Sequence, residues 1–137
     1  PISSLHALAQ DAAENTDAEY IAVAIDARMG EIYCASYHCI DGVATLVDEE
    51  RVCPPEEFLP LNNQQWLGAG TGWATYEQVL SANFSGQLHA VEAEHYPQAR
   101  TVITLAKIDG DAGKLLPAEQ AMPVYLRNNV AKKKAEQ

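Results

Sequence analysis

The predicted fold is built around one apolar run, Tyr20-Ile21-Ala22-Val23-Ala24-Ile25, which ends at Asp26. A run that is apolar at every position, without alternation between apolar and polar residues, is typical of a strand buried on both faces. Such a strand belongs in the middle of a sheet. We therefore expect residues 20–26 to form the central strand, with other elements covering both of its faces.

Two further strands follow the central one after short connections. Residues 31–37 are rich in β-forming side chains, and residues 43–47 follow the turn signal Asp41-Gly42. Strands joined by such short turns pair in antiparallel fashion. The sequence therefore predicts a three-stranded antiparallel meander.

Helical and extended patterns alternate around and after the meander. Apolar residues recur at helical spacing in residues 3–15, in residues 73–84 and between Pro97 and Gly110, where Ala99, Val102, Ile103 and Ala106 share one face. Shorter segments are expected as a helix at 55–59, strands at 66–69 and 88–91, and an extended segment at 121–130. This order predicts an α/β fold of the ribonuclease H-like type, a mixed sheet in which parallel strands extend the meander and helices flank the sheet.

Length and charge restrict the class of protein. The chain has 137 residues, so we expect a single domain over 1–137, with residues 131–137 as a disordered charged tail. The net charge of −10 disfavours nucleic acid and anionic membranes as direct partners, and Lys132–Lys134 is the only basic cluster. We see neither a membrane-spanning run nor a signal peptide, and three cysteines make neither a disulfide framework nor a zinc pattern. These features predict a reduced, cytoplasmic protein.

Asp26 is the first candidate for chemistry, because it ends the central strand. In ribonuclease H-like nucleases a carboxylate at this place helps to bind metal ions, and oxygen is the ligand that Mg²⁺ prefers. The other carboxylates that such a site would need are Asp48, Glu92 or Glu94, and their spacing is not diagnostic. The sequence favours the alternative, an aspartate that accepts backbone hydrogen bonds in a turn.

The glycine-rich turn at residues 68–72 is the second candidate. Between a strand and a helix, the backbone N–H groups of Gly70, Thr71 and Gly72 could approach a nucleotide phosphate. The turn lacks the Gly-Lys-Ser/Thr of a P-loop, and the dinucleotide fingerprint is incomplete. The favoured alternative is a tight turn that lets Trp73 fill the core.

The histidines and cysteines form no recognisable site. His6, His38, His89 and His95 are scattered, and we expect the segment containing Glu92, Glu94 and His95 to be a surface loop. Cys34 is expected to be buried in its strand and inert, whereas Cys39 and Cys53 are expected in turns. No serine lies in a nucleophile elbow. The residues therefore contain no complete catalytic constellation.

Arg127, Asn128 and Asn129 follow an apolar segment directly. An arginine here could bind a ligand phosphate or carboxylate through two hydrogen bonds. The favoured interpretation is structural, with Arg127 paired to Asp26 or Glu31 in a terminal segment.

Three segments together resemble one protein family. They are Ala24 to Tyr33, Gly70-Thr71-Gly72-Trp73, and Pro123 to Ala131. In composition, order and spacing they are similar to the bacterial TsaB (YeaZ) proteins, and the resemblance extends over essentially the whole chain. It implies the actin-like ATPase (ASKHA) superfold, made of two ribonuclease H-like lobes, within the glycoprotease (peptidase M22) superfamily. The present chain corresponds to the second lobe only.

The resemblance also implies a function. TsaB proteins act with TsaD and TsaE in forming threonylcarbamoyladenosine in tRNA, where TsaD carries the metal and the transfer chemistry. The chain is then expected to be a non-catalytic scaffold or activator without a cofactor, in which Asp26, Arg28, Gly30 and Trp73 are architectural. Contact with tRNA is expected to be indirect, and there is no membrane partner.

The resemblance places the main contact with TsaD on the first lobe. An isolated second lobe is then expected to bind TsaD weakly, because it has no obvious exposed apolar stripe. Its helix at residues 3–15 is expected to expose apolar residues where the lobes would meet, and so to allow non-physiological self-association.

Overall fold

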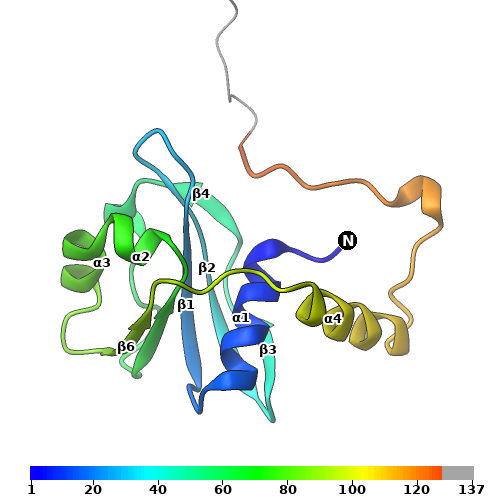
Figure 1. The fold of residues 1–137 in the computed structure, drawn as a ribbon, viewed down its shortest axis with the longest axis horizontal. Coiled ribbons are helices and arrows are strands. Elements are labelled where there is room, and N and C mark those ends of the chain that lie inside the picture. The colour runs from blue at the N-terminus through cyan, green and yellow to red at the C-terminus, as the bar shows by residue number, and fades with distance from the viewer. Residues whose placement is uncertain (128–137) are drawn as a thin grey trace, which may run out of the picture.

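The computed structural model describes residues 1–127, which form a six-stranded mixed sheet with helices on both faces (Figure 1). The strand order is β3-β2-β1-β5-β6. β4 lies off this path and pairs with β2. β1 pairs antiparallel with β2 and parallel with β5, and β5 pairs parallel with β6. This topology confirms the predicted ribonuclease H-like fold. The strands are β1 (Tyr20–Asp26), β2 (Ile32–Ile40), β3 (Val43–Leu46), β4 (Arg51–Cys53), β5 (Trp66–Ala69) and β6 (Leu88–Glu92).

The helices form two layers, one on each face of the sheet (Figure 1). One layer contains α1, which packs on β1, β2 and β3, and α4, which packs on α1. The other contains α2, which packs on β1 and β5, together with α3 and η1. The bounds are α1 (Ser4–Asn15), η1 (Pro55–Glu57), α2 (Gly72–Thr75), α3 (Glu77–Asn83), α4 (Ala99–Asp111) and η2 (Ala118–Gln120). No helix within residues 1–127 is long and apolar enough to cross a membrane.

β1 is the central strand, as the sequence predicts. Ile21 and Val23 belong to the core under α1, whereas Ala22 and Ala24 belong to the core under α2 and α3, and all four are fully buried. Successive side chains of a strand point to opposite faces, so both cores use the same strand. The small side chains of Ala22 and Ala24 leave room for α2 to approach the sheet closely.

Several predicted boundaries are wrong. The single helix expected at 73–84 is two helices, because Tyr76 leaves the helical conformation with φ −121° and ψ 39°. β4 was not predicted, since three residues are too few to show a period. Cys53 therefore lies in a strand, and Cys39 lies in β2, so neither cysteine is in a turn as expected. Gly110 does not stop α4, which continues to Asp111.

The apolar stripe predicted on α4 does not face the core. Thr101 and Leu105 are the buried side chains of this helix, whereas Ala99, Val102, Ile103 and Ala106 are exposed. The exposed fraction of Ile103 is 69%. The expectation that the chain lacks an exposed apolar stripe is therefore wrong.

α1 does not expose the apolar residues that the sequence analysis expected. Leu5, Leu8, Ala9 and Ala12 are buried against the sheet and α4. The predicted route to self-association through this helix is wrong for this reason. Asn128, Asn129 and the tail at 131–137 lie outside the described residues.

Candidate functional site

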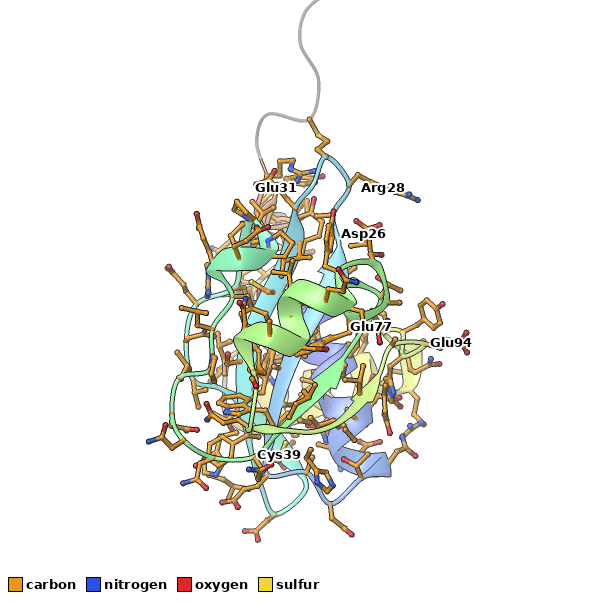
Figure 2. The ribbon with its side chains drawn as sticks, turned by 90° about the vertical axis from the view of Figure 1, so that its left-hand side faces the viewer. Asp26, Arg28, Glu31, Cys39, Glu77 and Glu94 are labelled. Atoms are coloured by element: carbon orange, nitrogen blue, oxygen red, sulfur yellow. The ribbon has the colours of Figure 1, made fainter. Side chains whose placement is uncertain are left out.

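Asp26, Thr71 and Arg127, which the sequence analysis selected, gather at one end of the sheet. Figure 2 shows Asp26, Arg28 and Glu31 together at this end and Cys39 at the opposite end. The backbone N–H of Asp26 donates to Oγ1 of Thr71 over 3.1 Å, which joins β1 to the glycine-rich turn. Arg127 reaches the same end from the far end of the described chain and bonds to the carbonyl oxygen of Ala27. We call this group of contacts the β1-end cluster.

The loop between β1 and β2 has a strained backbone. Arg28, Met29 and Gly30 have φ values of 64°, 56° and 74°, so three successive residues adopt the left-handed conformation. That conformation is free of steric cost only for glycine. The other two residues must be held by their surroundings, and their side chains project into solvent.

Asp26 stabilises the start of this loop. Its Oδ1 accepts a hydrogen bond from the backbone N–H of Arg28 over 3.0 Å. This is the turn role that the sequence favours, and the carboxylate makes no ion pair with Arg127. The alternative partner predicted for Arg127, Glu31, is the correct one.

Arg127 stabilises the loop from the other side. Its guanidinium donates to the carbonyl oxygen of Ala27 over 2.6 Å and to Oε1 of Glu31 over 2.7 Å, and it lies 5.7 Å from the ring centroid of Tyr33. Its side chain is 9% exposed. A charged hydrogen bond shielded from water is among the stronger kinds in a protein. The guanidinium is thus held by the protein's own backbone and side chains.

Arg127→Ala is expected to lower the free energy of unfolding by about 1.5–3 kcal/mol, because the carbonyl oxygen of Ala27 and the carboxylate of Glu31 lose a charged donor. Urea unfolding measures this change. Glu31→Gln is the control, since its amide oxygen still accepts a hydrogen bond, and we expect less than half of the loss. Equal stability of Arg127→Ala and the unchanged protein would contradict a structural role for Arg127.

The glycines of the turn at 68–72 are required by close packing. A Cβ at Gly70 would overlap the carbonyl oxygen of Ala24 and lie 3.1 Å from its carbon, and a Cβ at Gly72 would lie 2.9 Å from Cβ of Ala24. The φ of Gly70 is +108°, which side chains rarely allow. The glycines therefore let the turn lie against β1. Whether Gly70, Thr71 and Gly72 also contact a nucleotide stays a prediction.

Trp73 follows the turn and lies flat on Gly68. A Cβ at Gly68 would be 2.5 Å from the indole Cε2, and the indole Nε1 donates to the carbonyl oxygen of Ala22 over 2.9 Å. Its ring also meets Phe84 edge to face, with 5.3 Å between centroids. The predicted core position of Trp73 is confirmed, with 1% exposure.

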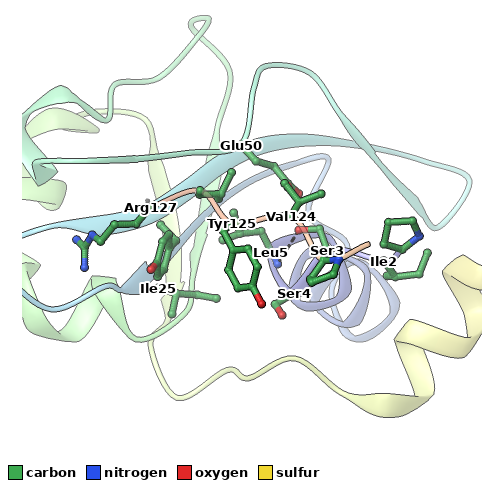
Figure 3. Close-up of a pocket in the computed structure, with 13 residues that line it drawn as sticks. Ile2, Ser3, Ser4, Leu5, Ile25, Glu50, Val124, Tyr125 and Arg127 are labelled. Carbon is green, nitrogen blue, oxygen red and sulfur yellow. Dashed lines mark hydrogen bonds between the residues drawn. The ribbon is translucent and has the colours of Figure 1, made fainter. Parts of the chain in front are cut away.

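A cavity of about 600 Å³ borders the β1-end cluster (Figure 3). The first residues of the chain line one side, and residues 123–127 line another, while Ile25, Tyr33 and Glu50 come from the sheet and the loop before β4. Tyr37 Oη donates to Oε1 of Glu50 over 2.9 Å. Segments from both ends of the described chain thus line the cavity.

Of the other carboxylates predicted as metal ligands, Asp48 and Glu92 have partners within the fold, whereas Glu94 is exposed. Asp48 accepts from the backbone N–H of Ser36 over 2.8 Å and pairs with Arg51, and Glu92 contacts His95. In residues 1–127 no three side chains of His, Cys, Asp or Glu are arranged to hold a metal ion. Asp26 is therefore not brought together with the carboxylates proposed from sequence.

The thiols are protected by burial. Burial raises the pKa of the Cys34 thiol far above its ordinary value. The thiol of Cys53, whose Sγ lies 3.5 Å from that of Cys34, is the second cause of the rise. Burial raises the pKa of Cys39 to about 11. The thiolate is the nucleophilic form, so neither thiol is activated near neutral pH.

Sequence reasoning missed a second polar cluster, formed by Asp11, Glu14, Glu92, His95 and Arg100. The segment after β6 was expected to be a plain surface loop, but His95 has a side chain only 14% exposed and contacts Asp11 in α1. Eighty-four positions separate these two residues, so no local pattern could reveal the contact.

Comparison with known proteins gives the family. Residues 1–135 match the family model described as "TsaD: tRNA N6-adenosine threonylcarbamoyltransferase". The tRNA threonylcarbamoyladenosine biosynthesis proteins TsaB of Haemophilus influenzae and Escherichia coli are each 35% identical to the chain, over 98% and 97% of its length. The chain spans 58% of the length of each of these curated relatives.

Solved structures agree with the sequence comparison. YeaZ from Pseudomonas aeruginosa superposes with a TM-score of 0.81 at 38% identity, over 91% of this chain and 57% of that one. A second crystal structure, of an uncharacterized protein with similarity to peptidase YeaZ from Pseudomonas aeruginosa, also gives 0.81 at 39% identity, over 92% of this chain and 57% of that one. The chain therefore belongs to the TsaD family, on its TsaB (YeaZ) branch.

Proposed function

We propose that the chain is a non-catalytic scaffold lobe in the formation of threonylcarbamoyladenosine in tRNA. It would act in the cytoplasm with a TsaD-type transferase and a TsaE-type partner, and would contact tRNA only through them. Family membership supports the pathway, because two relatives carry it in their names.

One observation favours a scaffold over an enzyme. Three polar residues that the sequence analysis selected are bonded within the fold: Asp26 to the N–H of Arg28, Thr71 to the N–H of Asp26, and Arg127 to Ala27 and Glu31. Catalytic groups need free hydrogen-bonding capacity directed at a substrate. The bonds that these three groups make within the fold support a role in holding a rigid surface.

The partner test compares this chain with the protein expressed from its complete gene. The resemblance places the TsaD contact on a first lobe, so the complete protein is expected to co-elute with TsaD in size-exclusion chromatography at micromolar concentration, whereas residues 1–137 elute separately. A stable interface generally buries about 1,200–2,000 Å². Co-elution of the short chain comparable to that of the complete protein would place the contact on this lobe instead.

The second candidate function is nucleotide binding at the turn of residues 68–72, favoured by its position between β5 and α2. Isothermal titration with ATP and ADP, with and without Mg²⁺, decides between the two. The scaffold proposal expects no saturable heat from residues 1–137. Micromolar binding that Thr71→Val abolishes, in a variant that still folds, would favour the nucleotide-binding alternative.

A further inference from the structure

Two connections of the meander reverse the chain through positive φ angles, but they use different residues to do so. The turn between β2 and β3 has φ values of 52° and 76° at Asp41 and Gly42. Glycine and aspartate tolerate this backbone conformation better than most residues. The connection between β1 and β2 has φ values of 64° and 56° at Arg28 and Met29, two residues that this conformation does not favour. Turn formation therefore does not explain why arginine and methionine occupy these positions.

Packing within the fold does not explain the two side chains either. Both are exposed, and the exposed fraction of Met29 is 69%. Figure 2 shows the side chain of Arg28 pointing away from the body of the molecule. The sulfur of Met29 lies 3.6 Å from Nη1 of Arg127, in a contact that is itself exposed. Neither side chain thus contributes to a core.

The backbone of this connection is nevertheless held firmly. Oδ1 of Asp26 accepts a hydrogen bond from the N–H of Arg28, and the N–H of Glu31 donates to the carbonyl oxygen of Arg28, each over 3.0 Å. The buried guanidinium of Arg127 binds the carbonyl oxygen of Ala27. Backbone strain persists only where surrounding contacts maintain it, and it is concentrated at functional positions. The fold therefore maintains a strained backbone from which two exposed side chains project.

We infer that Arg28 and Met29 form a docking tip for a partner protein whose surface offers an apolar pocket with a carboxylate at its rim. The inference rests on the proposed scaffold function, because a scaffold needs a surface for the proteins that it holds. Arginine and methionine are both enriched in protein interfaces, and a preorganised loop loses little conformational entropy on binding. The net charge of −10 disfavours nucleic acid, an anionic membrane or a second copy of this chain at the tip.

Met29→Asn separates a docking role from a structural one. Asparagine is favoured at positive φ, so the melting temperature of the variant is expected to stay the same or rise. The affinity for a partner is expected to fall about tenfold, as when an interface side chain that carries binding energy is removed. The variant is made in the protein expressed from its complete gene, and binding to purified TsaD and to purified TsaE is measured by isothermal titration. Arg28→Asn is expected to behave in the same way.

Lys107→Asn and Leu61→Asn are the matched controls. They remove one exposed charge and one exposed apolar side chain elsewhere on the surface, and they should leave both affinities unchanged. Met29→Gly, which also fits a positive φ, replaces Met29→Asn if that variant does not fold.

The outcomes distinguish this inference from the scaffold proposal. If the unchanged complete protein binds neither TsaD nor TsaE, the scaffold proposal fails and the docking tip fails with it. If it binds and the variants at Arg28 and Met29 bind equally well, only the docking tip is overturned. Losses of the same size in the two controls would also overturn it. Dimerisation of the complete protein that Met29→Asn abolishes would make a second copy the occupant and contradict the inference.

Discussion

Trp73→Ala is expected to lower the free energy of unfolding by about 3–5 kcal/mol, as large aromatic truncations in a core do. The indole is 1% exposed, covers Gly68 and contacts Phe84. Its removal leaves a cavity between β5 and α2 and takes away the hydrogen bond to the carbonyl oxygen of Ala22. Urea unfolding measures the loss.

Trp73→Phe separates the two causes, because it keeps an aromatic ring but not the Nε1 donor. We expect it to cost less than half as much as the alanine variant. An unchanged melting temperature in Trp73→Ala would show that the side chain does not support the core, and would reopen a ligand or partner role for it.

Gly70→Ala is expected to destabilise the fold by about 3 kcal/mol or more, by combining a backbone penalty of about 1–3 kcal/mol with steric overlap. The φ of +108° is strained for any side chain, and the new Cβ would overlap the carbonyl oxygen of Ala24 in the central strand. Backbone atoms of a central strand cannot move aside cheaply. The melting temperature and the soluble yield report the effect.

Gly86→Ala is the matched control for this variant. Gly86 also has a positive φ, +79°, but nothing lies within 4 Å of its Cβ position. It should show the backbone penalty alone, about 1 kcal/mol. Equal effects at the two positions would mean that the turn does not press on β1 as described.

The core of the fold was predictable from local patterns. The antiparallel strands β1, β2 and β3 are visible in the sequence because apolar runs and the Asp41-Gly42 turn are local signals. Trp73 was placed in the core because a glycine turn precedes it. The β4 strand was not visible, since it exists only through pairing with β2.

α4 shows why the rest could not be predicted. Periodicity identifies an apolar stripe but does not say what covers it, and here Thr101 and Leu105 are buried while Ile103 faces solvent. The contacts of Arg127 and His95 with residues far away in sequence are set by tertiary packing. Resemblance to a family supplied the function, because the spacing of polar residues carries no signal for tRNA modification.

Asp26→Asn tests the scaffold proposal most directly. The asparagine keeps an oxygen for the N–H of Arg28 and removes the charge that metal binding or acid–base chemistry would need. The variant, made in the protein expressed from its complete gene, is combined with TsaD, TsaE and tRNA, and threonylcarbamoyladenosine formation is measured. We predict a rate within about twofold of the unchanged protein and a similar melting temperature, since a lost catalytic acid or base would slow the reaction about 10²–10⁴-fold. A folded Asp26→Asn protein that forms no threonylcarbamoyladenosine would contradict the scaffold role and make Asp26 a catalytic residue.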